Sequence, residues 1–278
     1  MNSFKGRNGH LVPALLLGLL LVFSFSQQTL AQQLRLATTN YPPFYGEDLP
    51  NGGPFSQIAR QAFEDVGYEV TIDFIPWARA LEWAAEGKVD GLLGAWITPE
   101  RKDYFVETVS VMSNTMVFYR KRNSKTTFDS FDDLAKQKLW IGTVYGYAQP
   151  RGLIEAGVNL IYATQDKQLF MLLGKGRIDL VVVDKTFAEL ALALPDMQEH
   201  RENVEHLEGF VEQRDMHILM SKNLTNADEI AQAFNKGLAI LKKDGRFQQI
   251  VMNVMSGTEK DKLIEFEPEI SSQAGSVQ

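Results

Sequence analysis

A short phrase occurs twice in this chain, and each time it leads into an apolar run. Residues 87–94 read Gly-Lys-Val-Asp-Gly-Leu-Leu-Gly, and residues 176–183 read Gly-Arg-Ile-Asp-Leu-Val-Val-Val. Each phrase ends a helical pattern, turns at its glycine and begins a short buried strand, so the repetition predicts two similar α/β lobes. The cation Arg101 follows the first copy and the anion Asp184 follows the second. These opposite charges predict a cleft for a small zwitterion.

The N-terminal residues have the pattern of a secretory signal peptide. Lys5 and Arg7 precede an uncharged, mostly apolar run over residues 11–25, and Thr29-Leu30-Ala31 presents small residues where a signal peptidase cleaves. A membrane span needs about 20 apolar residues, and this run is shorter, so cleavage after Ala31 is favoured over an N-terminal anchor. A signal peptide over residues 1–31 predicts that the mature chain resides in the periplasm.

Composition excludes several classes of function. The chain has a formal net charge of −7, and an acidic exported protein is poorly suited to bind nucleic acid or an anionic membrane. It contains no cysteine, which excludes disulfides and thiol catalysis. With only 4 histidines, a histidine-rich metal site is not expected, and we expect neither a metal nor a cofactor. The length suits two domains of ordinary size.

Hydrophobic spacing predicts alternating strands and helices along the chain. Strands are expected over residues 34–38 and 68–75, and helices over residues 55–66 and 77–85. Residues 180–183 carry no polar side chain, which is typical of a strand covered on both faces. The order strand, helix, strand, helix, strand indicates a mostly parallel sheet flanked by helices.

The lobes are predicted to be joined by two crossings. The apolar strand over residues 116–119 is followed by a basic segment, residues 120–125, which we interpret as the first crossing, and the strand over residues 216–220 carries the chain back. Two crossings form a hinge that allows closure on a ligand. The expected division is lobe 1 over residues 32–119 and 218–258, lobe 2 over residues 120–217, and a flexible tail over residues 259–278.

The two charges also have simpler interpretations. The guanidinium of Arg101 presents a planar fork of donors that matches a carboxylate, but spacing alone favours a surface pair with Glu100 or Asp103. The carboxylate of Asp184 can accept a ligand ammonium or cap a helix over residues 187–194. These two uses of Asp184 are compatible, and capping is favoured when the residue is considered alone.

Aromatic residues gather at predicted strand ends and loops, where rings often line pockets. Core packing explains any single one of them, but as a group they predict an aromatic-lined cleft. They are Tyr41, Phe44, Tyr45, Trp77, Trp96, Tyr145 and Tyr147.

Taken in order, these segments resemble the periplasmic solute-binding proteins of the polar amino-acid type, bacterial extracellular family 3. The resemblance covers residues 34–255, and Ile97-Thr98-Pro99-Glu100-Arg101 is its most specific part. Its other marks are Tyr41-Pro42-Pro43-Phe44, Gly87-Lys88-Val89-Asp90-Gly91, Ile141-Gly142 with Gly146, and Gly176-Arg177-Ile178-Asp179 with Asp184. The resemblance implies the type II periplasmic binding protein fold: two α/β lobes, each a mixed, mostly parallel sheet flanked by helices, joined by two hinge strands.

The resemblance also implies roles for individual residues. In the family, the arginine of this motif grips the ligand α-carboxylate, which maps onto Arg101, and an aspartate at the position of Asp184 binds the α-ammonium. Residues after the lobe-two glycine help to hold the carboxylate, and an aromatic ring near the first strand end stacks on the ligand. The expected ligand-binding residues are Arg101, Asp184, Tyr41, Phe44, Trp77, Trp96, Gly94, Tyr147 and Ala148.

Two positions depart from the family pattern. Trp96 stands five residues before the arginine, where the family often has Ser or Thr, and Tyr147 replaces a small side chain that carries a hydroxyl. Both changes enlarge the side chain, so the pocket is expected to be smaller, flatter or more aromatic. Pro76-Trp77-Ala78-Arg79-Ala80 resembles a divergent branch of the family.

The expected function is periplasmic capture of a small polar solute, an amino acid or related carboxylate, by hinge closure and its delivery by a monomer to an ABC transporter permease. No catalytic residue is expected, because the sequence has no Gly-x-Ser-x-Gly elbow, phosphate loop or His-Glu-x-x-His segment. Two alternatives stay open. One is a periplasmic enzyme similar to cyclohexadienyl dehydratase, which requires an acid or base beside Arg101. The other is an accessory protein that senses a ligand for a membrane receptor.

Overall fold

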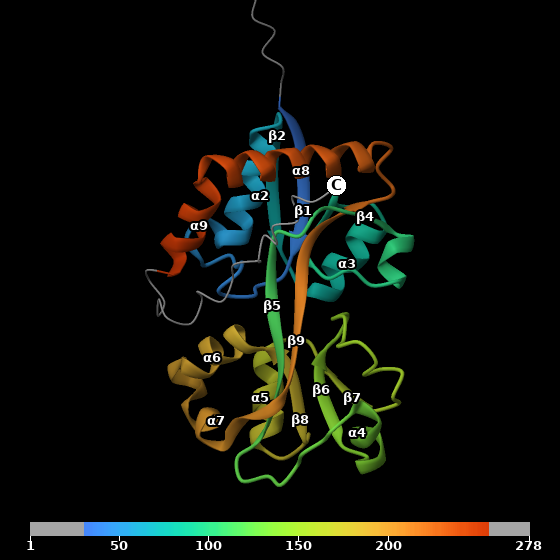
Figure 1. Cartoon of the computed structure of the whole chain (residues 1–278), viewed down its shortest axis with the longest axis vertical. Helices are drawn as coiled ribbons and strands as arrows, with labels where there is room; N and C mark the ends of the chain where they lie inside the picture. The colour runs from blue at the N-terminus through green and yellow to red at the C-terminus, as the bar shows by residue number, and fades with distance from the viewer. Residues whose placement is uncertain (1–30, 256–278) are drawn as a thin grey trace, which may run out of the picture. The chain divides into compact units, whose positions relative to one another are not determined.

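The computed structural model describes residues 31–255. The predicted signal peptide, up to residue 30, and the predicted tail over residues 259–278 lie outside the described residues. None of the helices within residues 31–255 is long and apolar enough to cross a membrane. The strands form a curled mixed sheet in the order β2-β1-β3-β9-β5-β8-β6-β7, with helices packed against it (Figure 1).

The first lobe is built on parallel strands. β1 (Gln32–Thr38) pairs in parallel with β2 (Tyr68–Phe74) on one side and with β3 (Gly91–Ala95) on the other. Helices α2 (Pro54–Glu64) and α3 (Trp77–Ala85) connect these strands, so the predicted order of strands and helices is confirmed. The remaining elements of this lobe are η1 (Pro50–Gly52), η2 (Glu100–Asp103), β4 (Phe105–Glu107), α8 (Ala227–Asp244) and α9 (Arg246–Met255).

The core of the first lobe lies where α8 packs on α2. The rings of Phe63 and Phe234 are both fully buried there, with centres 5.0 Å apart. Gly237 allows the two helices to approach closely, because a Cβ at this position would overlap the carbonyl oxygen of Ala62. This contact fixes the helical layer over the sheet that carries the site.

The second lobe has β6 (Trp140–Val144) at its centre, parallel to both β7 (Asn159–Ala163) and β8 (Leu180–Asp184). All residues of β8 are buried, which confirms the prediction from its apolar run. The repeated phrase joins a helix to a strand in both lobes, between α3 and β3 and between α5 and β8. The helices of the second lobe are α4 (Phe131–Gln137), α5 (Asp166–Gly174), α6 (Lys185–Ala193), η3 (Pro195–Met197) and α7 (Gln198–Asn203).

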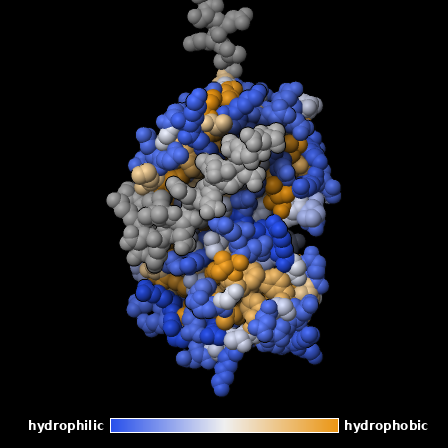
Figure 2. Space-filling model, in the orientation of Figure 1, coloured by the Kyte–Doolittle hydropathy of each residue, from blue (hydrophilic) through white to orange (hydrophobic). Residues whose placement is uncertain are grey.

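Two long antiparallel strands join the lobes. β5 (Met112–Lys121) pairs with β9 (Val204–Ser221), and residues 217–221 of β9 continue into the first lobe, where they pair with β3 and β4. Figure 1 shows β5 and β9 side by side between the lobes. On the face drawn in Figure 2, hydrophilic residues predominate, and hydrophobic residues gather on the second lobe close to the first.

The first two residues of the basic segment over residues 120–125 lie in the second-lobe sheet. Arg120 and Lys121 belong to β5, and β5 pairs with the second-lobe strand β8 through Arg120. The Nε of Arg120 also donates to Glu205, its partner across the ladder with β9, at 3.0 Å. We therefore propose that the first crossing lies within residues 112–116, and the other lobe boundaries stay predictions.

Candidate functional site

Arg101 is buried beside a second-lobe loop. It lies in η2 with 8 % of its surface exposed. Its guanidinium donates to the Trp96 carbonyl at 2.8 Å and to the Gly146 carbonyl at 3.0 Å. Its Cζ lies 5.4 Å from the centre of the Trp77 ring. The side chain therefore contacts the first-lobe loop and the second-lobe loop at once.

The positive charge of Arg101 has no carboxylate in contact with it within the part of the chain that the structure describes. Among the residues that the structure describes, no carboxylate forms an ion pair with this guanidinium, so the surface pair with Glu100 or Asp103 is not found. Burial, together with the nearby charge of Arg214, lowers the pKa of Arg101 to about 10. The group stays charged at neutral pH, and a buried charge is costly unless it is paired. An anion bound here would relieve that cost.

The loop after β6 forms the second-lobe side of the site. The Gly146 carbonyl accepts from the Trp77 indole N–H at 2.8 Å as well as from Arg101. Tyr147 packs edge-on against Trp77, with ring centres 6.1 Å apart, and its hydroxyl donates to Asp166 at 2.9 Å. Tyr147 and Ala148 therefore lie around the same space as Arg101, as the family pattern implied.

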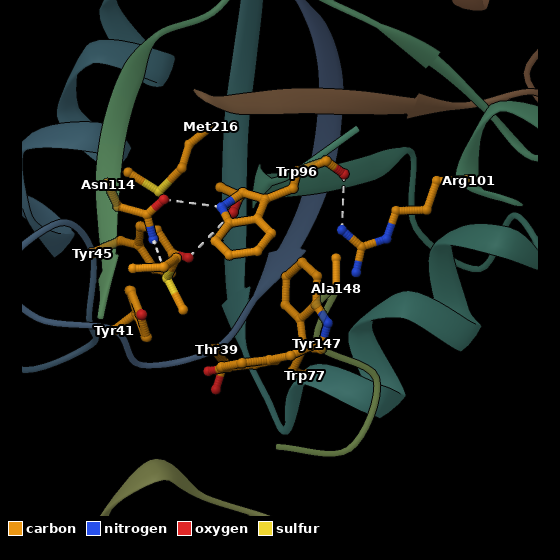
Figure 3. Close-up of a pocket in the computed structure, with 12 residues that line it drawn as sticks. Thr39, Tyr41, Tyr45, Trp77, Trp96, Arg101, Asn114, Tyr147, Ala148 and Met216 are labelled. Carbon is orange, nitrogen blue, oxygen red and sulfur yellow. Dashed lines mark hydrogen bonds between the residues drawn. The ribbon is translucent and has the colours of Figure 1, made fainter. Parts of the chain in front are cut away.

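Trp96 is held between polar side chains. Its Nε1 donates to the Oδ1 of Asn114 at 3.0 Å, and the guanidinium of Arg214 lies 4.7 Å from the ring centre. Figure 3 shows the indole with Asn114 on one side and Arg101 on the other. These contacts fix a large ring beside Arg101, where the family pattern has a small hydroxyl side chain.

Gly94 lies at a bulge in β3 and makes room for Tyr45. The register of β3 with β9 shifts between Leu93 and Ala95. Gly94 has a φ of 79°, and a Cβ there would overlap the Tyr45 ring. Gly94 thus reaches the site through its backbone. Tyr45 belongs to the aromatic group that the sequence singled out but not to the expected ligand-binding set.

Tyr41 connects the two lobes on the side of the site away from Arg101 (Figure 3). Its ring stacks on Phe187 of α6, with centres 4.8 Å apart and planes inclined by 9°. Phe44 packs against Tyr41, with ring centres 6.0 Å apart, and is 2 % exposed. Of these two rings, only Tyr41 faces the cavity described below.

Asp184 caps α6, as its position after a strand predicted. One carboxylate oxygen accepts from the Phe187 backbone N–H at 2.7 Å, and the other accepts from the Thr115 backbone N–H at 2.9 Å. The residue is fully buried. Burial raises the pKa of Asp184 to about 7, although these backbone hydrogen bonds oppose the rise. Asp184 is not among the residues that line the cavity described below.

These residues line a partly open cavity of about 50 Å³. All the expected ligand-binding residues line it except Phe44 and Asp184. The lining residues that were not expected are Thr39, Tyr45, Asn114, Met116 and Met216. Thr39 and Tyr45 flank the Tyr41 segment, so proximity in sequence could have indicated them. The other three lie on β5 and β9, whose patterns predict strands but not which residues face the cavity.

The curled mixed sheet, the two joining strands and the cavity beside them define the periplasmic binding protein fold. The family of bacterial extracellular solute-binding proteins, family 3, matches residues 34–255. The chain belongs to this family, which confirms the fold and the family that the sequence predicted.

Individual relatives are distant. The chain is similar to the L-cystine-binding protein TcyJ of Escherichia coli (strain K12), with 26% identity over 216 residues, or 76% of this chain and 77% of that protein. It is similar in structure to a histidine kinase sensor domain (TM-score 0.68, 20% identity, 82% of this chain and 98% of that chain). It is also similar to AncCDT-1, an ancestral amino acid-binding protein and precursor of cyclohexadienyl dehydratase (TM-score 0.62, 22% identity, 80% and 94%). At these identities the solved structures show the fold alone.

Proposed function

We propose that this protein binds a small carboxylate-bearing solute, an amino acid or a related acid, between its lobes and delivers it to a membrane transporter. The observation that carries the proposal is the buried guanidinium of Arg101, which lines the cavity and has carbonyls rather than carboxylates as its partners among the described residues. A guanidinium has more N–H donors than two carbonyls accept. A ligand carboxylate would use the remaining donors and supply the missing counter-charge.

Ligand binding is coupled to closure in this proposal. Arg101 and Trp77 belong to the first lobe, whereas Tyr147 and Ala148 belong to the second, and all four line the cavity. A ligand that contacts both sets binds the closed arrangement more tightly than an open one, so it favours closure by differential affinity. β5 and β9 act as the hinge strands.

We place this activity in the periplasm, with a monomer as the working form and a membrane permease as the receiving partner. The signal-peptide pattern of the N-terminus and membership of an extracellular solute-binding family support this location. Gene neighbourhood tests the partner, since an adjacent permease and ATPase would favour transport, whereas an adjacent kinase or cyclase would favour sensing.

A thermal-shift screen tests the proposed function. Wild-type protein and Arg101→Met are screened against amino acids, small and aromatic carboxylic acids, and polyamines. A ligand that binds only the folded state raises the Tm, so at least one carboxylate-bearing compound should raise the Tm of the wild type and not that of Arg101→Met. Arg79→Met, which removes an exposed charge on α3, is the matched control. Equal shifts in wild type and Arg101→Met would contradict the proposal.

One observation favours a second candidate, an enzyme that catalyses elimination. Asp166 is buried, and burial raises the pKa of its carboxyl to about 6, although its hydrogen bond with Tyr147 opposes the rise. A carboxyl that titrates near neutral pH can transfer protons. Tyr147 lines the cavity and Asp166 does not, which favours binding over catalysis. NMR of a prephenate-like compound incubated with the protein decides between them, because an unreacted bound compound supports binding and product formation supports an enzyme.

A further inference from the structure

The charges at the cavity narrow the chemical class of the ligand. We infer that the ligand is a compact carboxylate without an ammonium group, rather than a zwitterionic amino acid. This inference rests on the proposed function, because it takes the cavity beside Arg101 as the ligand site. It follows from which charges face the cavity, which are covered and how much space remains.

The charge that faces the cavity is positive. Among the residues that line it, Arg101 alone carries a side chain that is ionised at neutral pH. Burial raises the pKa of the lining tyrosines Tyr41, Tyr45 and Tyr147, so they stay neutral. Asn114 contributes a neutral amide whose oxygen already accepts from Trp96. The cavity therefore complements an anion, and a bound zwitterion would find no carboxylate for its ammonium group among these lining residues.

The carboxylate that would receive an ammonium group is covered. Asp184 is fully buried, and both of its oxygens accept from backbone N–H groups, those of Phe187 and Thr115. Tyr41 lies beside this cap: it lines the cavity and stacks on Phe187, whose backbone N–H donates to Asp184. An ammonium group that approached Asp184 past Tyr41 would have to displace this ring from its stack.

Asp166 is covered in the same manner by a second tyrosine. The hydroxyl of Tyr147 donates to Asp166 at 2.9 Å, and the Tyr147 ring is held edge-on by both Trp77 and Tyr41, with ring centres 6.1 and 6.2 Å away. An ammonium group at Asp166 would have to replace that hydrogen bond and move a packed ring. Within the part of the chain that the structure describes, the two buried carboxylates, Asp166 and Asp184, therefore each have a cavity-lining tyrosine packed beside them.

The remaining space limits the size of the ligand. The cavity has a volume of about 50 Å³, whereas an engineered apolar cavity that binds benzene has about 150 Å³. Trp96 and Tyr147 occupy space that the smaller side chains of the family pattern would leave open. With these two rings in place, a small aliphatic acid is expected to fit better than an aromatic acid.

Matched compounds separate the contributions of the two ligand groups. Propionate carries the carboxylate alone, ethylamine carries the ammonium group alone, and L-alanine carries both. The fourth compound, 3-phenylpropionate, is propionate with an added phenyl ring. We expect calorimetry to give propionate a Kd at least about tenfold lower than that of L-alanine, with weaker binding of 3-phenylpropionate and none of ethylamine. Tyr41→Ala uncovers Asp184 and should narrow the difference between propionate and L-alanine. Tyr145→Ala, at an exposed tyrosine outside the cavity, should not.

The outcomes distinguish this inference from the proposed function. If L-alanine binds wild-type protein more tightly than propionate and Arg101→Met abolishes both, the inference is overturned and the proposed function stands. If neither acids nor amino acids bind, or if Arg101→Met binds them as wild type does, the proposed function fails as well. Unchanged selectivity in a folded Tyr41→Ala protein also counts against the inference. The main comparison uses wild-type protein, so it does not depend on the folding of a variant.

Discussion

The guanidinium of Arg101 donates a hydrogen bond to the carbonyl of Gly146 at 3.0 Å, and this bond joins the first lobe to the second. The indole N–H of Trp77 donates to the same carbonyl at 2.8 Å. One backbone oxygen therefore accepts from two first-lobe side chains. The residue that we propose to bind the ligand thus also takes part in holding the lobes together.

Trp77→Phe should weaken ligand binding without removing the aromatic wall. The change keeps a ring beside Arg101 but deletes the N–H that donates to Gly146. The closed arrangement that binds the ligand therefore loses one hydrogen bond between the lobes. A neutral hydrogen bond contributes about 1 kcal/mol, so calorimetry should show an affinity about fivefold lower. Trp83→Phe on the same helix is the matched control, because that ring lies against Arg35. Equal affinity losses in both variants would contradict a specific role for the Trp77 bond.

Trp96→Ser should lower stability and relax the size limit of the cavity. Truncation of a large buried ring costs about 3–5 kcal/mol, and this ring also contacts Asn114 and Arg214, so a lower Tm is expected. The enlarged cavity should bind 3-phenylpropionate more tightly relative to propionate than the wild type does. A folded variant that keeps the wild-type ratio of the two affinities would show that Trp96 does not set the size limit.

Stability should decline as the pH rises from about 4 to about 7. Burial raises the pKa of Asp166 to about 6 and that of Asp184 to about 7, from an ordinary value of 3.8. In this window the folded protein retains protons that the unfolded chain has released. As the pH rises through this window, the titration of each group therefore lowers the free energy of unfolding by up to about 1.4 kcal/mol per pH unit. Urea unfolding across this range measures the slope, and Asp166→Asn should flatten it. A slope that Asp166→Asn leaves unchanged would contradict this assignment.

Gly237→Ala should destabilise the first lobe. The added Cβ would overlap the carbonyl oxygen of Ala62, so α8 and α2 would have to move apart. Overpacking of a buried contact costs about 1–3 kcal/mol, and a clash with backbone is expected at the upper end of that range. Urea unfolding measures the loss, with Gln232→Ala, at an exposed position of the same helix, as the control. The same stability in both variants would argue against the close helix contact.

The features that the sequence predicts well depend on a few neighbouring residues. Asp184 follows a strand and precedes a helix, so its role as an N-cap could be predicted from local sequence. The segment that ends in Arg101 forms a local turn, in which the Arg101 backbone N–H donates to the Thr98 hydroxyl at 3.3 Å. Such short-range geometry is why the family motif could identify Arg101.

The features that the sequence does not predict depend on distant partners. Arg120 lies in β5 opposite Glu205, which is 85 positions away and accepts its hydrogen bond, and no pattern around Arg120 indicates this partner. Asn114 lines the cavity from β5, where it pairs with Arg214 of β9, 100 positions further along the chain. The covering of Asp184 likewise depends on the stacking of Tyr41 on Phe187, two residues from different lobes. These arrangements are set by the packing of the lobes and leave no local signal.

Calorimetric titration of the tightest-binding carboxylate into Arg101→Met tests most directly whether this guanidinium binds the ligand. Hydrogen bonds to a charged group contribute about 1.5–3 kcal/mol each. We therefore expect Arg101→Met to bind at least about 100-fold more weakly than wild type, Arg101→Lys to be intermediate and Arg79→Met to be unaffected. A folded Arg101→Met protein whose Kd stays within about threefold of the wild-type value would contradict the account.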